Sequence, residues 1–207
     1  MVNNMTLNDY LNKKKEFEFY VLNINKTNNY YQEIIDVFLE GIINAYIYEN
    51  NDYTIVVSNV MNPDVNQLVN AIIEDFGYKL KVFKSNKILT EHIDDFKTLK
   101  KLYFKYQEYI NDNFVNIQKL VQTILEKDSN DLTYIRPIIL RKINSDPKLY
   151  EIVNGMFVND LNVCKTANYV YMHRNTINNK LITIKEETGL DIQKFQDAVI
   201  LYVLLKK

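Results

Sequence analysis

The chain has 207 residues, and its 25 Lys and Arg against 26 Asp and Glu give a net charge of −1. This balance excludes a protein that is basic over its whole surface, so any contact with nucleic acid must depend on a local basic patch. Apolar residues make up 47% of the chain, which is ample material for a hydrophobic core. The single Cys excludes an intrachain disulfide and a Cys-cluster metal site, and the two scattered His argue against a zinc site built on imidazole.

Targeting and catalytic motifs are missing from the sequence as well. No apolar run reaches the roughly 18 residues of a membrane-spanning helix. The N-terminus, MVNNMTLNDY, lacks the basic start and apolar stretch of a signal peptide. We therefore expect a soluble cytoplasmic protein with no membrane contact. Because no Walker sequence, Gly-Ser elbow or metal triad occurs, we also expect no catalytic residues, no metal and no cofactor, and hence no enzyme.

The first part of the chain alternates between strand and helix patterns. Residues 16–24 are rich in β-formers and predict a strand. The run that follows places Ile34, Ile35, Phe38 and Leu39 at helical spacing. Two further β-prone runs, 45–49 and 53–58, flank Asn50, Asn51 and Asp52, which favour a tight turn. These two runs predict a hairpin.

A second helix and a fourth strand come next. Asn62-Pro63-Asp64 supplies a helix cap and a Pro at the first helical position, and Gly77 ends the helix. Its apolar stripe consists of Val65, Leu68, Val69, Ile72, Ile73 and Phe76. Residues 78–83 then alternate as a strand. The order β-α-β-β-α-β can close as an antiparallel sheet with both helices on one face.

Residues 90–127 are helical by periodicity, with interruptions near 111–113. One face of this helical arm consists of Leu99, Leu102, Tyr103, Tyr106 and Ile110. The arm completes the core of the sheet domain, pairs with a second copy of the chain, or does both. The polar segment 128–132 predicts a linker, and everything beyond it is helical by periodicity. We therefore expect an α+β domain with a helical arm at residues 1–127 and an all-α domain at residues 128–207.

The strongest functional signal lies in the C-terminal domain. A short helix around 163–170 is followed by Tyr171-Met172-His173, and a second helix runs from Arg174 to about Glu187. Two helices joined by such a short turn are typical of a helix-turn-helix, whose second helix enters the major groove of DNA. In this second helix we expect a buried face of Ile177, Leu181 and Ile184.

The opposite side of the second helix carries Arg174, Asn175, Asn178 and Asn179, and Arg and Asn are suited to bidentate contacts with guanine and adenine. Between residues 160 and 185, four cations (Lys165, Arg174, Lys180 and Lys185) face Asp160 alone, so this segment has a charge of 4 − 1 = +3. The alternative is that these residues are ordinary solvated helix faces. Cys164, within the first helix, is interpreted as a small packing residue.

The same segment resembles the C-terminal helix-turn-helix of bacterial transcription regulators of the PucR and CdaR type. The resemblance depends on Lys165-Thr166-Ala167, His173-Arg174-Asn175-Thr176-Ile177, Leu181, Ile184, Thr188-Gly189-Leu190-Asp191, Phe195, Asp197 and Leu201. Upstream, 135–138 and 146–149 also fit, so the resemblance covers about residues 132–207. It implies a regulator that binds double-stranded DNA as a homodimer, with an effector that the sequence leaves unknown.

Single residues of this segment also have expected roles, which follow from their own chemistry as well as from the resemblance. The expected DNA-binding residues are Lys165, Thr166, His173, Arg174, Asn175, Thr176, Asn178, Asn179 and Lys180. Thr166 and Ala167 are small enough for close packing of the two helices, and His173 either caps the second helix or contacts a phosphate. Gly189 ends that helix in a left-handed conformation, and Asp191 caps the next helix.

One departure from the family pattern concerns Asn178-Asn179-Lys180, because the family usually carries Arg-Tyr-Arg at this place. Two strong cationic contacts are thereby reduced to one, which implies weaker or altered DNA binding.

The front domain resembles, in topology alone, the degenerate GGDEF-like domain that such regulators often carry. In active nucleotide cyclases of this fold, paired Asp residues hold a metal and glycines form the hairpin turn. This chain has Asn23-Ile24-Asn25 and Glu49-Asn50-Asn51-Asp52 at those places, so cyclase activity is not expected.

Three hypotheses follow. The first is a sequence-specific transcription regulator that acts as a dimer, with the front domain or the helical arm as the expected dimer contact. The second is a protein-interaction module that has lost DNA binding. The third is a ligand-sensing module or residual enzyme in the front domain.

Overall fold

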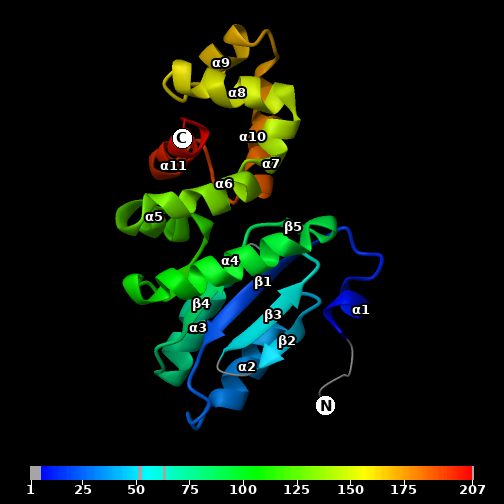
Figure 1. Cartoon of the computed structure of the whole chain (residues 1–207), viewed down its shortest axis with the longest axis vertical. Coiled ribbons are helices and arrows are strands. Elements are labelled where there is room, and N and C mark those ends of the chain that lie inside the picture. The colour runs from blue at the N-terminus through cyan, green and yellow to red at the C-terminus, as the bar shows by residue number, and fades with distance from the viewer. Residues whose placement is uncertain (1–5, 51–52, 63, 207) are drawn as a thin grey trace. The chain divides into compact units, whose positions relative to one another are not determined.

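The computed structural model describes residues 6–50, 53–62 and 64–206. The chain folds as two compact units, residues 1–116 and 117–207, which we call the N-terminal unit and the C-terminal unit (Figure 1). The first unit is mixed α+β and the second is helical, which confirms the predicted fold class.

The N-terminal unit consists of α1 (Leu7–Leu11), β1 (Glu16–Asn23), α2 (Tyr31–Glu40), β2 (Tyr46–Asn50), β3 (Thr54–Ser58), α3 (Val65–Phe76), β4 (Lys81–Lys84), β5 (Ile88–Leu89), the 3-10 helix η1 (Thr90–His92), α4 (Ile93–Tyr106), the 3-10 helix η2 (Gln107–Tyr109) and β6 (Phe114–Val115). The C-terminal unit consists of α5 (Ile117–Lys127), the 3-10 helix η3 (Ser129–Asp131), α6 (Leu132–Ile139), α7 (Arg141–Ser145), α8 (Pro147–Val158), α9 (Val163–Tyr169), α10 (Arg174–Thr188) and α11 (Phe195–Lys206).

The sheet of the N-terminal unit has the strand order β2-β3-β1-β4-β6, and β5 pairs with the start of β1. β1 lies between β3 and β4 and is antiparallel to both, with Tyr20 opposite Val56 and Val21 opposite Phe83. The predicted β-α-β-β-α-β order is therefore confirmed. The helix α1 and the short strands β5 and β6 are additions, and β6 runs parallel to β4.

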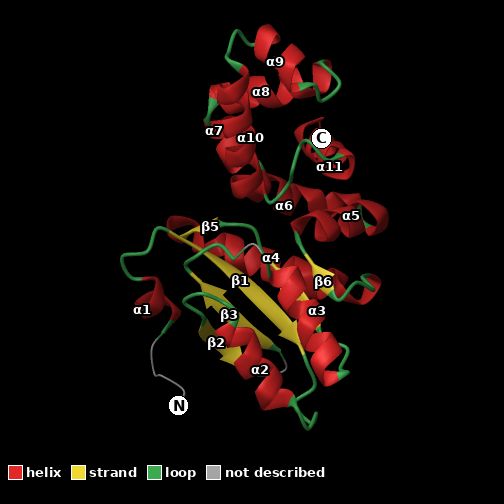
Figure 2. Cartoon of the chain, turned by 180° about the vertical axis from the view of Figure 1, so that it is seen from behind, coloured by secondary structure: helices red, strands yellow, loops and turns green. Residues whose placement is uncertain are grey.

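Helices cover both faces of this sheet. On one face α2 and α3 cover the strands (Figure 2). Ile34 and Phe38 of α2 and Val69 of α3 belong to one buried cluster with strand residues such as Tyr20. This confirms the prediction that the two helices lie on one face. On the other face lies α4 (Figure 1). Its Tyr103 stacks on Phe83 of β4, with ring centroids 4.6 Å apart.

The predicted helical arm is divided between the two units. Its first part, α4, buries the predicted face and completes the core of the sheet domain. Its second part, α5, buries Leu120, Val121 and Ile124 within the C-terminal unit. The division of the chain accordingly falls between Asn116 and Ile117 rather than after Lys127, and the polar segment 128–132 lies inside the C-terminal unit. The reason is that the apolar stripe of α5 packs with α6 and α11.

Asn62 has a different role from the predicted helix cap. It is buried, and its backbone N–H and side-chain amide donate to the Glu18 carboxylate of β1 at 2.8 and 3.2 Å. Lys84 of β4 pairs with the same buried carboxylate at 3.3 Å. Asn62 therefore fixes the loop in front of α3, and Asp64 occupies the cap position without a side-chain hydrogen bond. The end of α3 at Gly77, with φ of 59°, agrees with the prediction.

Two predicted features fall partly outside the described residues. These are Asn51 and Asp52 of the hairpin turn, and Pro63 before α3. The strands that flank the turn, β2 and β3, do pair as an antiparallel hairpin.

Candidate nucleic-acid interface

Helix α8 is the platform on which the helix-turn-helix packs. Asp146 caps it, with its carboxylate accepting from the backbone N–H of Lys148 at 3.0 Å and of Leu149 at 3.3 Å. Further along, Gly155 allows α9 to approach closely, because a Cβ at this position would lie only 3.1 Å from Cγ2 of Thr166. The Thr166 hydroxyl donates to the Gly155 carbonyl at 3.2 Å, which holds α9 against α8.

A tight turn of residues 170–173 joins α9 to α10. Tyr171 stands at this turn with a φ of 53°, in the left-handed region that a bulky residue rarely adopts, and 96% of it is exposed. The backbone N–H of Met172 donates to the Ala167 carbonyl at 2.9 Å and closes the turn. The predicted arrangement of two helices joined by a short turn is therefore present.

The first turn of α10 is organised by His173. This residue is the N-cap, and its Nδ1 accepts from the backbone N–H of Asn175 at 3.2 Å. Of the two roles predicted for His173, the structure therefore shows the capping role. The helix contains no acidic residue in its first turn, so the positive end of its dipole faces no local carboxylate.

The two faces of α10 agree with the predicted pattern. Ile177, Leu181 and Ile184 are buried in the core of the C-terminal unit. The helix ends at Gly189 with a φ of 74°, as predicted, and its N–H donates to the Lys185 carbonyl at 2.9 Å. Burial of one apolar face therefore fixes the direction of the polar face.

Most of the predicted DNA-binding residues lie on the surface. Lys165, His173, Arg174, Asn175, Thr176 and Asn179 are exposed, and Asn178 and Lys180 are partly exposed. Thr166 is the exception, because it is fully buried and bonded to α8. Its side chain is not available to a duplex, and it belongs to the packing of the helices instead.

Two of the cations in this segment have carboxylate neighbours. Lys180 Nζ lies 4.0 Å from Oδ2 of Asp146, and Lys185 Nζ lies 3.1 Å from Oδ2 of Asp191. Such surface ion pairs contribute at most about 1 kcal/mol and are easily exchanged for a phosphate. The positive charge of the segment therefore stays accessible to an anionic partner.

The corner between α10 and α11 depends on a residue whose role the sequence did not reveal. Asp197 is buried, and its Oδ2 accepts from the backbone N–H of Asp191 at 2.8 Å. Burial raises the pKa of Asp197 above its ordinary value, although this hydrogen bond opposes the shift. Asp191 accepts from the Gln193 N–H within the turn rather than capping α11, which begins only at Phe195.

Cys164 is exposed on α9 rather than packed as expected. Within residues 6–50, 53–62 and 64–206, no group of three or more His, Cys, Asp or Glu side chains is arranged to hold a metal. No helix in the same ranges is long and apolar enough to cross a membrane.

Comparison with known proteins gives a family match and similar solved structures. The family model of the PucR C-terminal helix-turn-helix domain matches residues 149–206. Among solved structures, the crystal structure of a regulator of polyketide synthase expression from Bifidobacterium adolescentis is similar at 15% identity and a TM-score of 0.43, over 92% of this chain and 79% of that chain. No match to a curated protein was found. Residues 149–206, which contain α9, the turn, α10 and α11, are therefore the part of the chain that matches the PucR C-terminal helix-turn-helix domain.

Proposed function

We propose that the chain is a transcription regulator of the PucR type from the bacterial cytoplasm, and that it binds double-stranded DNA as a dimer through α10. The observation that carries the proposal is the first turn of α10. Arg174, Asn175 and Thr176 are exposed there, while the apolar face that begins at Ile177 is buried. The match of residues 149–206 to a helix-turn-helix family supports the same role.

In this proposal α10 is the recognition helix. Arg174 and Asn175 at its start reach base edges, where Arg suits guanine and Asn suits adenine. Asn178, Asn179 and Thr176 contact bases or backbone from the following turn, and Lys165 of α9 and Lys180 of α10 contact phosphates. Two lysines per subunit amount to about four phosphate contacts in a dimer, so the logarithm of affinity should fall with the logarithm of salt with a slope of about −4.

Selection of bound sequences from a pool of random duplexes tests this proposal. We expect enrichment of an inverted repeat whose half-sites lie one helical turn, about 34 Å, or a multiple of it apart. We also expect retention to fall as salt is raised. Absence of any enriched sequence, with retention independent of salt, would contradict DNA binding.

We infer that the N-terminal unit is a degenerate, non-catalytic relative of the GGDEF domain. Its strand order and its two helices on one face support this. At the end of β1, Asn23 and Asn25 are neutral amides, which are weak magnesium ligands. The side-chain oxygen of Asn25 already accepts from the Thr27 N–H and is 2.9 Å from the Thr27 hydroxyl.

One observation favours the alternative of a protein-interaction or ligand-sensing module. An open pocket of about 600 Å³ lies beside the turn and is lined by Tyr150, Glu151, Asn154, Asn168, Tyr169 and Tyr171. Within the described residues its lining contains no Lys or Arg, so it is unsuited to a phosphate. This alternative predicts that no duplex shifts at low salt and that Tyr169→Ala weakens binding of a partner recovered with the wild-type chain.

A further inference from the structure

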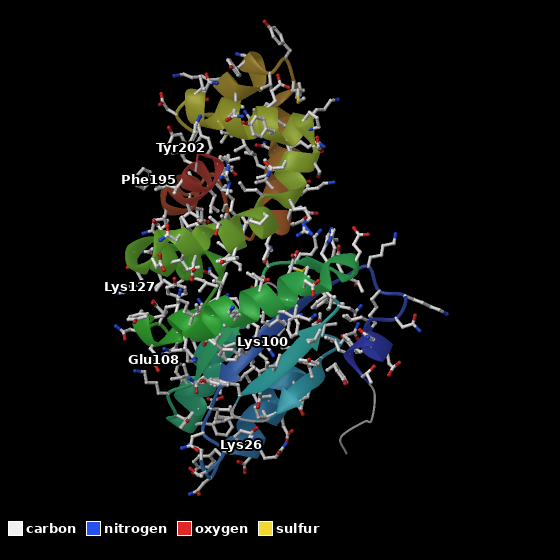
Figure 3. All side chains as sticks on the ribbon, in the orientation of Figure 1. Lys26, Lys100, Glu108, Lys127, Phe195 and Tyr202 are labelled. Atoms are coloured by element: carbon white, nitrogen blue, oxygen red, sulfur yellow. The ribbon has the colours of Figure 1, made fainter. Side chains whose placement is uncertain are left out.

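The outer face of α11 is apolar and exposed. Phe195, Val199 and Tyr202 follow one another at helical spacing, so they lie on one side of the helix, and their exposed fractions are 77%, 43% and 47%. Figure 3 labels Phe195 and Tyr202 on α11. The other side of the helix, with Ala198, Leu201 and Leu204, is buried in the C-terminal unit. α11 is thus apolar on both sides.

This outer face continues onto α8. The ring of Tyr202 packs edge-on against Phe157, with centroids 5.3 Å apart, so the two helices present a joint aromatic surface. We call Phe157, Phe195, Val199 and Tyr202 the α11 patch. A helix on the surface of a protein normally turns polar residues outward, and a helix that is apolar all round is normally covered. The α11 patch therefore has the composition of a protein contact.

We propose that a second copy of the chain covers the α11 patch, with the two α11 helices packed antiparallel about a two-fold axis at Val199. The order of residues along α11 is compatible with such self-pairing, because the small Val199 lies between two aromatic residues, Phe195 and Tyr202. An antiparallel arrangement places Val199 against Val199 and brings Phe195 of each copy to Tyr202 of the other. An interface of this kind is isologous, with the same patch on both subunits.

The exposed area agrees with a reversible dimer. A Phe or Tyr side chain offers roughly 200 Å² of surface, so the exposed fractions of Phe195 and Tyr202 correspond to roughly 250 Å², and Val199 brings the total to roughly 300 Å². Two copies then contribute about 600 Å² of apolar surface, which at the usual apolar share of about 60% corresponds to an interface of about 1,000 Å². This is the lower limit of specific interfaces, where complexes are weak or transient.

This dimer contact rests on the proposed function only for its biological role, because the contact itself can form and be measured without DNA. It belongs to the helix-turn-helix domain itself, instead of the front domain or the arm that the sequence suggested. A weak contact of this kind would become effective on DNA, because binding of one half-site raises the local concentration of the second subunit.

Sedimentation of the full chain without DNA tests the dimer separately from DNA binding. We expect the apparent mass to rise from near the monomer value of 24.6 kDa toward twice that value as the concentration increases. For a weak, reversible contact of this kind, the midpoint should lie in the range of roughly 10–100 μM.

Matched substitutions locate the contact. Val199→Glu places like charges across the two-fold axis, and Phe195→Glu buries a charge against Tyr202 of the other copy. Each should raise the dissociation constant by at least about 10-fold. Tyr134→Glu replaces another exposed aromatic residue, on α6, and should leave dimerisation unchanged. Far-UV circular dichroism and thermal melting confirm that each variant is folded.

A cysteine pair provides a second readout. In a Cys164→Ser background, Val199→Cys should form a disulfide-linked dimer under mild oxidation, whereas Tyr134→Cys should not. A chain that stays monomeric up to about 500 μM, and whose Val199→Cys variant gives no cross-link, would overturn the proposal. So would a dimer that Phe195→Glu and Val199→Glu leave intact.

Discussion

Single hydrogen bonds hold the two ends of α10 in place, and the proposed contact with DNA depends on them. At the start, Nδ1 of His173 accepts from the Asn175 N–H. A ring nitrogen can accept only while it carries no proton, so this cap requires that Nδ1 be unprotonated. At the far end, the carboxylate of Asp197 accepts from the Asp191 N–H and fixes the corner between α10 and α11.

Replacement of the cap tests the first of these hydrogen bonds. His173→Ala should lower the free energy of unfolding by about 1 kcal/mol, because one N–H of the first turn loses its partner. His173→Asn should keep most of the stability, since Asn is among the best N-cap residues. Urea unfolding followed by circular dichroism measures both changes. Equal stability of the Ala variant and the wild type would show that the cap is dispensable.

Asp197 gives a prediction about pH. Because burial raises its pKa in the folded chain, the folded state holds the proton more tightly than the unfolded state, and this contribution to stability is lost as pH rises through the folded pKa. Asp197→Asn keeps an acceptor for the Asp191 N–H and carries no charge. Its stability relative to the wild type should therefore increase as pH rises from below the ordinary value of 3.8 to neutral.

The control for this variant is Asp197→Ala, which leaves the Asp191 N–H without its acceptor and should therefore be less stable than Asp197→Asn by about 1–3 kcal/mol at every pH. Thermal melting at several pH values measures both variants. A stability difference between Asp197→Asn and the wild type that does not change with pH would contradict a raised pKa.

At the scale of elements, Gly155 sets how closely α8 and α9 cross. A Cβ on this residue would lie 3.1 Å from Thr166, and 3.3 Å from both Tyr169 and Val170. All three residues belong to α9 or the turn after it, so the helix as a whole would have to move. We expect Gly155→Ala to destabilise the domain by about 1–2 kcal/mol, although Ala favours helix more than Gly does.

Urea unfolding of Gly155→Ala measures this cost, and Asn154→Ala, at the neighbouring position of α8, provides the control. If Gly155→Ala were more stable than the wild type, helix propensity would outweigh the close approach and α8 would have room for a Cβ. The variant should also weaken DNA binding, because α9 and the start of α10 move together.

Prediction from sequence succeeded where periodicity is strong. A regular apolar spacing distinguishes strand from helix in five elements: β1, the β2–β3 hairpin, α2, α3 and α10, whose buried face contains Ile177, Leu181 and Ile184. The two-residue strands β5 and β6 carry no period of their own, since they exist only through pairing with β1 and β4. The burial of Asp197 was missed because a polar residue gives no signal of burial in the sequence. Thr166 was predicted both to pack between helices and to bind DNA, and the structure shows it buried in the packing.

At the scale of the whole molecule, the chain combines a sheet domain with a helical domain of the helix-turn-helix type. The sequence predicted both domains but placed the boundary after Lys127, since the apolar stripe of α5 does not reveal which core it joins. The exposed residues for which DNA contact is predicted, such as Arg174, Asn175 and Thr176, begin α10 in the C-terminal unit. The proposed function therefore depends on the first turn of α10 being the surface that contacts DNA.

Binding of a selected duplex by Arg174→Ala, measured by fluorescence anisotropy at fixed salt, tests this claim most directly. Lys127→Ala provides the matched control, because it removes an exposed cation from α5, outside the helix-turn-helix family match. We predict that Arg174→Ala weakens binding by about 1–3 kcal/mol and relaxes the preference at one base position, while Lys127→Ala changes affinity by less than about 2-fold. Unchanged affinity and unchanged base preference in Arg174→Ala would contradict the assignment of α10 as the recognition helix.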